Sequence, residues 1–181
     1  MRSKHWFLLV FFLMLMSWLP KKTYATHIVG AVIEYECINP TFNTYRVDLT
    51  LYRDEVIGVA PFDGQITVFI FRSNGTLFTT RLVTLPPGPP DNLPVNFNSC
   101  TGTPLNIQTE FKNYSFNITL PPIAGGYDIA WARCCRYNTV TNISNNQGIT
   151  VLAHVPGSEV PGCNSNPRFN QLPPSFLCVG E

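Results

Sequence analysis

The segment Leu120–Asn138, LPPIAGGYDIAWARCCRYN, decides the fold because it places two adjacent cysteines inside a strand-like pattern. Tyr127, Ile129 and Trp131 alternate with small or polar residues, which is the period of a β-strand. Successive residues of a strand point to opposite faces of a sheet, so we expect Cys134 and Cys135 to bond with different partners. The segment therefore predicts a disulfide-stabilised β domain.

The start of the chain has the layout of an export signal. Arg2 and Lys4 precede an apolar run from Trp6 to Leu19, and cleavage is predicted after the small residue Ala25. The run of about 14 apolar residues is shorter than the roughly 20 that cross a bilayer, which disfavours a membrane anchor. We expect the mature protein to be exported, to the periplasm or to the extracellular cell surface.

Cleavage changes the charge of the chain. Removing Arg2, Lys4, Lys21 and Lys22 from the 12 basic residues leaves eight against 11 acidic residues, a net charge of −3 with neutral histidines. A negative chain is poorly suited to bind nucleic acid. The 156 residues that remain suit a single domain.

Alternating apolar residues predict two half-buried strands, at residues 29–37 and 45–52. Gln65–Arg72 is apolar on both faces and predicts a central strand covered on both sides, followed by a hairpin turn at Ser73-Asn74-Gly75. A last strand is predicted at Ile149–Val155. About seven strands, without a sustained helical period, predict an antiparallel β-sandwich of immunoglobulin-like or related topology.

The segment Ile107–Leu120 changes parity. Ile107 and Phe111 occupy odd positions, whereas Tyr114, Phe116 and the later apolar residues occupy even ones. A bulge near Lys112-Asn113 would reconcile the two halves of this predicted strand.

We predict three parts in the chain: a signal peptide at 1–25, a β-sandwich domain at 26–155 and a strap rich in Pro and Asn at 156–181. The strap is expected to lead toward a downstream domain that this chain lacks. Within the sandwich, Pro86–Pro104 holds six prolines, which remove backbone donors, and predicts a long surface connection tied down by Cys100.

Cysteines are the only site residues that the sequence nominates. The disulfide candidates are Cys37, Cys100, Cys134, Cys135, Cys163 and Cys178. The first-choice pair is Cys163 with Cys178, because it closes a short loop worth on the order of 3 kcal/mol. Cys134 and Cys135 would then pair with Cys37 and Cys100 in an order left open. A direct Cys134–Cys135 bond, typical of a redox or conformational switch, is the alternative.

Metal, cofactor and catalytic sites are not predicted. Asp54, Glu55 and Asp63 flank one loop, but they lack the alternating spacing of a calcium loop, and no C-x-x-C pair suggests zinc. His154 has no neighbouring nucleophile pattern. Trp131 could contribute to a sugar platform, although its place on the apolar strand face favours the core.

Six segments of the chain carry a resemblance to a known family: THIVGAVIEYEC (26–37), YRVDLTLYRD (45–54), APFDG (60–64), SNG (73–75), LPPIAGGYDIAWARCCRYNTVTNI (120–143) and CNSNPRFNQLPPSFLCVGE (163–181). Taken together, they resemble the amino-terminal module of large Bacteroidetes surface proteins. Those relatives carry a gliding-motility-associated carboxy-terminal sorting domain read by type IX secretion, which we expect this chain to lack. The resemblance implies an extracellular, adhesin-like β module without a known activity.

The leading functional hypothesis is a non-enzymatic surface or cell-envelope module that holds or spaces adhesive domains, or binds an extracellular protein or glycan. A carbohydrate-binding domain is the first alternative and would need tryptophan or tyrosine facing solvent. An exported hydrolase is the second, and would need His154 or paired acids in a concave site.

Overall fold

A computed structural model describes residues 28–56, 60–93, 108–134 and 147–168. The predicted signal peptide lies outside these ranges. Within them, the model contains no helix with the length and apolar character of a membrane span.

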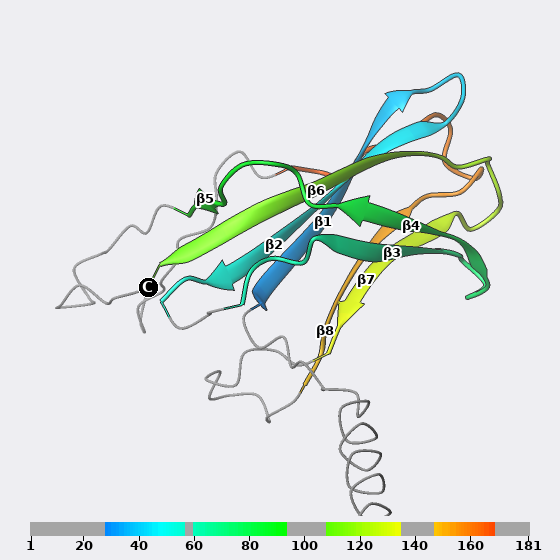
Figure 1. Cartoon of the computed structure of the whole chain (residues 1–181). Coiled ribbons are helices and arrows are strands. Elements are labelled where there is room, and N and C mark those ends of the chain that lie inside the picture. Colours follow the sequence, from blue (N-terminus) through cyan, green and yellow to red (C-terminus); the bar gives the residue numbers. More distant parts are fainter. Residues whose placement is uncertain (1–27, 57–59, 94–107, 135–146, 169–181) are drawn as a thin grey trace, which may run out of the picture.

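Two antiparallel four-stranded sheets form the domain (Figure 1). The first sheet, which we call sheet A, has the order β1-β2-β6-β5, and sheet B has the order β4-β3-β7-β8. The predicted antiparallel β-sandwich is therefore confirmed, with eight strands in the described residues. Their bounds are β1 Ile28–Asn39, β2 Thr44–Asp54, β3 Gln65–Arg72, β4 Leu77–Thr84, β5 Asp91–Asn92, β6 Thr109–Thr119, β7 Tyr127–Arg133 and β8 Ile149–Val155.

The core lies between the sheets and is built from alternate residues of their strands, as expected for a strand with one buried face. Sheet A contributes Val47, Leu49 and Leu51 from β2, and sheet B contributes Ile70 and Ile129, all of them fully buried. Hydrophobic burial of this kind is the main force that holds the layers together. The sequence alternation thus predicted the inner face of β2 correctly. In β1 it predicted the buried Ile33 and Tyr35, but a register shift between Ile28 and Gly30 buries Ile28 in place of Val29.

The hairpin between β3 and β4 also follows the prediction. Gly75 has a φ of 80°, a left-handed conformation that glycine adopts without steric cost. The side chain of Asn74 accepts hydrogen bonds from the backbone N–H and the hydroxyl of Thr76, at 3.0 and 2.7 Å. Asn-Gly therefore fixes the turn through local hydrogen bonds.

The prediction that β3 is covered on both sides is wrong. Ile66, Val68 and Ile70 are buried, but Thr67 and Phe69, which point the other way, are exposed. The strand is central within its sheet, yet only one face of that sheet packs on the core. Apolar residues on the outer side of β3 are therefore left at the surface.

The predicted bulge near Lys112 is also wrong. The pairing of β2 with β6 runs without a shift from Thr44 opposite Thr119 to Asp54 opposite Thr109. The inward positions of β6 therefore include Glu110 and Lys112, which are buried. Phe111 instead faces outward, where its ring lies 5.9 Å from that of Tyr52. One of these inward side chains, Glu110, has a charged partner in Arg53 of β2.

Candidate functional site

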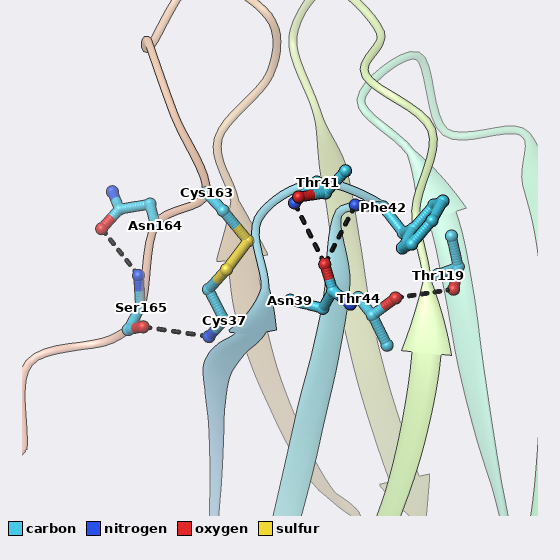
Figure 2. The surroundings of a disulfide bond; sticks show 9 residues. All are labelled: Cys37, Asn39, Thr41, Phe42, Thr44, Thr119, Cys163, Asn164 and Ser165. Carbon is cyan, nitrogen blue, oxygen red and sulfur yellow. Dashed lines mark hydrogen bonds between the residues drawn. A yellow bond between two sulfur atoms is a disulfide. The ribbon is translucent and has the colours of Figure 1, made fainter.

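The strap after β8 is fastened covalently to the first strand. Cys163 forms a disulfide with Cys37 of β1, with the two Cα atoms 5.7 Å apart and a separation of 126 positions in sequence (Figure 2). A Cα separation of this size is ordinary for a disulfide. The bond therefore joins the first strand of the domain to the segment that follows its last strand.

Hydrogen bonds seat the strap along the edge of β1. The backbone N–H of Tyr35 donates to the side-chain oxygen of Asn166 at 2.7 Å, and the N–H of Asn166 donates to the carbonyl of Tyr35 at 3.0 Å. The N–H of Cys37 donates to the hydroxyl of Ser165 at 3.0 Å (Figure 2). Edge-strand groups that would otherwise be open to pairing with another chain are thus occupied.

The predicted pairing of Cys163 with Cys178 is wrong, because Cys163 bonds with Cys37. The same bond excludes Cys37 as a partner of Cys134 or Cys135. The short loop between Cys163 and Cys178 favoured that pair. The strap instead runs back along β1 and brings Cys163 next to Cys37. Cys134 is also disulfide-bonded. Its partner lies outside the described residues, as do Cys100, Cys135 and Cys178, so the direct Cys134–Cys135 alternative stays open.

A hollow of about 220 Å³ lies beneath the strap, between the turns that follow β1 and β6. Tyr45 and Tyr127 contribute to its wall, and the Tyr127 hydroxyl donates to the carbonyl of Pro121 at 2.8 Å. Five prolines also line it, and none of its lining residues is charged: Pro40, Pro121, Pro122, Pro156 and Pro161. The prolines stiffen the base of the strap, because each fixes its own backbone φ.

The opposite end of the sandwich holds charged side chains between the sheets. Arg53 of β2 donates from Nε to Glu110 Oε2 at 2.7 Å and lies within 2.6 Å of it through Nη2. Arg53 also donates to the carbonyl of Ala60 at 2.7 Å and stacks over the ring of Phe62 at 4.9 Å. Arg53 therefore fixes the loop before β3 against sheet A.

Sheet B supplies a second ion pair to the same end. Arg133, at the end of β7, pairs with Asp63, whose carbonyl accepts a hydrogen bond from the Tyr114 hydroxyl at 2.7 Å. Burial lowers the pKa of Arg133. Asp63 is one of the three acidic residues that flank the loop discussed as a calcium site, but its carboxylate pairs with Arg133. The described residues contain no cluster of three His, Cys, Asp or Glu suited to a metal ion.

Lys112 completes this group, which we call the charged end: Arg53, Asp63, Glu110, Lys112 and Arg133. Lys112 is 6% exposed and lies opposite the buried Leu51. Its side-chain ammonium makes no hydrogen bond or ion pair within the part of the chain that the structure describes. The charged end thus has three basic groups and two acidic ones. Sequence reasoning missed it, although the parity change in Ile107–Leu120 was the signal.

The residues that a carbohydrate-binding domain or a hydrolase would need do not gather in one site. Trp131 and Tyr127 are each 3% exposed and belong to the core, as the strand pattern favoured. His154 Nδ1 lies 2.7 Å from Asp128 Oδ1, and both side chains are on the solvent side of sheet B. This His-Asp pair does not line the hollow beneath the strap.

Comparison with known proteins gives no relative: no protein-family model, curated protein or solved structure matches this chain. Its class therefore follows from the fold alone, as an antiparallel β-sandwich with a disulfide-fastened carboxy-terminal strap.

Tyr114 makes the stability of the fold sensitive to alkali. Burial raises its pKa to about 12, whereas tyrosine in an unfolded chain ionises near 10. The folded state holds the proton more tightly, so this stabilisation is complete below about pH 10 and is lost as the pH rises toward 12. Urea unfolding across this range should show a falling free energy of unfolding.

The matched variant for this prediction is Tyr114→Phe. It removes the hydrogen bond to the Asp63 carbonyl and should lower stability at neutral pH by about 1 kcal/mol. Its free energy of unfolding should also fall less steeply between about pH 10 and 12. An unchanged alkaline slope would contradict the assignment to Tyr114.

Proposed function

We propose that this chain is a non-enzymatic module of the cell surface or cell envelope, adhesin-like or structural, which holds or spaces adhesive domains. The observation that carries the proposal is the Cys37–Cys163 disulfide, which ties the first strand to the outgoing strap. Disulfides persist in oxidising compartments, which supports export. The resemblance to Bacteroidetes surface modules points in the same direction.

The path of the strap explains how such a module would bear tension. The strap runs antiparallel to β1, since Cys163 is next to Cys37 and Asn166 is next to Tyr35. Pulling on the two ends would therefore separate β1 and the strap one hydrogen bond at a time. The disulfide stops this separation at Cys37, and the residues between the two cysteines stay outside the path of the force.

Single-molecule pulling from the two ends of the exported protein tests this role. The oxidised protein should release only the residues outside the bridge. Reductant should release the chain behind it, whose 126-position separation gives a gain of roughly 45 nm at about 3.6 Å per residue.

The variant Cys37→Ser with Cys163→Ser assigns the effect to this bond, since it should extend by tens of nanometres more than the oxidised protein without any reductant. If the oxidised protein and this double variant release the same length, the domain does not transmit tension through the strap, and the load-bearing role is rejected.

A further inference from the structure

The two outer faces of the sandwich differ in character. Sheet A carries a charged network on its solvent side, where Arg46 lies 2.6 Å from Glu36 and 3.2 Å from Asp48. Arg168 of the strap adds to this network, 3.3 Å from Glu36. Surface ion pairs of this kind contribute little stability but keep a face hydrated.

The solvent side of sheet B, which we call the outer face, carries exposed large apolar side chains. Leu82 is 65% exposed, Leu152 58% and Phe69 36%. The rings of Phe69 and Phe71 stack at 6.3 Å between centroids. The alternation and pairing of the four strands define the face as Gln65, Thr67, Phe69, Phe71, Leu77, Thr80, Leu82, Thr84, Asp128, Ala130, Ala132, Thr150, Leu152 and His154.

Charge is almost absent from this face. Its two ionisable residues, Asp128 and His154, lie 2.7 Å apart and pair with each other. One register row crosses all four strands as Thr80, Phe69, Ala130 and Leu152. The centre of the face is thus a row of apolar and threonine side chains without charge, and charged residues are likewise depleted in interface cores.

We propose that two copies of this chain pack through their outer faces as a symmetric dimer. The central row of this face carries no ionisable side chain, so it opposes no charge to its own copy under a two-fold rotation. The centre of this face offers no charged group that could select a partner through complementary charge. Two such sheets would pack about 10 Å apart, in the way that sheets pack in sandwiches.

The size of the face suits a dimer of modest affinity. Four strands about 4.8 Å apart, with about seven residues each at 3.3 Å, cover roughly 20 by 23 Å. Two copies would then bury on the order of 1,000 Å², which is the lower limit for a specific interface. The proposed dimer goes beyond the role of the strap under tension. Its contacts lie on sheet B, and the strap takes no part in them.

Sedimentation equilibrium of the full exported chain tests the dimer. Phe69→Glu places like charges on both copies of the face and should raise the dimer dissociation constant at least tenfold. Leu152→Glu, at a more exposed position, should do the same and serves if Phe69→Glu fails to fold. Asn117→Glu, on the solvent side of β6 in sheet A, is the control and should leave association unchanged.

A wild-type chain that stays monomeric up to about 0.2 mM would overturn the proposal, because we propose a dimer with a dissociation constant below that concentration. Dimers that persist in both face variants would overturn it as well, because they would assemble through another surface, such as the edge of β4. Neither result would bear on the pulling experiment, which concerns the strap alone.

Discussion

Replacing Cys37 and Cys163 together by serine is expected to lower the free energy of unfolding by about 5 kcal/mol. The bridge spans 126 residues, and the entropy of closing a loop of that length in the unfolded chain gives this magnitude. A domain of this size commonly has a total stability of about 5–15 kcal/mol, so the variant should be marginal at 37 °C. Urea unfolding of the oxidised wild type and the double variant measures the difference.

Ser165→Ala is the matched control for this change. It removes only the hydrogen bond from the Cys37 N–H to the Ser165 hydroxyl and should cost about 1 kcal/mol. If the cysteine variant loses no more than this control, the bridge does not restrain the unfolded chain, and the strap is held by its hydrogen bonds alone.

The second large effect is expected at the charged end. Glu110→Gln should lower the free energy of unfolding by about 3 kcal/mol, because it leaves the buried guanidinium of Arg53 without its carboxylate. Lys112 aggravates the loss, because it adds a buried positive charge on the same strand face that no described residue pairs with. Urea unfolding at neutral pH measures the change.

Lys112→Met separates charge balance from packing in this prediction. It removes the unpaired ammonium and leaves two basic and two acidic groups, so it should be neutral or stabilising by about 1 kcal/mol. Combined with Glu110→Gln, it should recover part of the loss, since the two residues lie in one cluster. Strict additivity of the two changes would contradict a shared electrostatic cluster.

Sequence patterns predicted the parts of the fold that depend on local chemistry. The alternation in β2 and in most of β1, the Asn74-Gly75 turn and the final strand β8 are all as expected, because period and turn residues act over a few neighbours. The inward positions of Trp131 and Tyr127 follow from the same alternation.

The errors arise where the structure depends on distant partners. Glu110 and Lys112 look misplaced on an inward strand face until Arg53, from the neighbouring strand, is known to lie opposite Glu110. The run Gln65–Arg72 is apolar on both sides, but nothing in a single sequence tells whether a second layer covers its outer face. Cys178 is the cysteine nearest to Cys163 in sequence, but the strap returns along β1 and places Cys163 next to Cys37.

The same distinction applies to the candidate site. Six cysteines and an export signal predicted a disulfide framework, and the structure contains the Cys37–Cys163 bond. Its connectivity required the path of the chain, because six cysteines permit fifteen pairings. The charged end required the register of β2 against β6.

Disulfide mapping of the protein recovered from outside the cytoplasm tests the central claim most directly. Proteolysis without reductant, followed by mass spectrometry, should yield one cross-linked species that joins the peptide of Cys37 to the peptide of Cys163. Free thiols at these two positions, or a bridge from Cys163 to Cys178, would contradict the disulfide-fastened strap on which the proposed function depends.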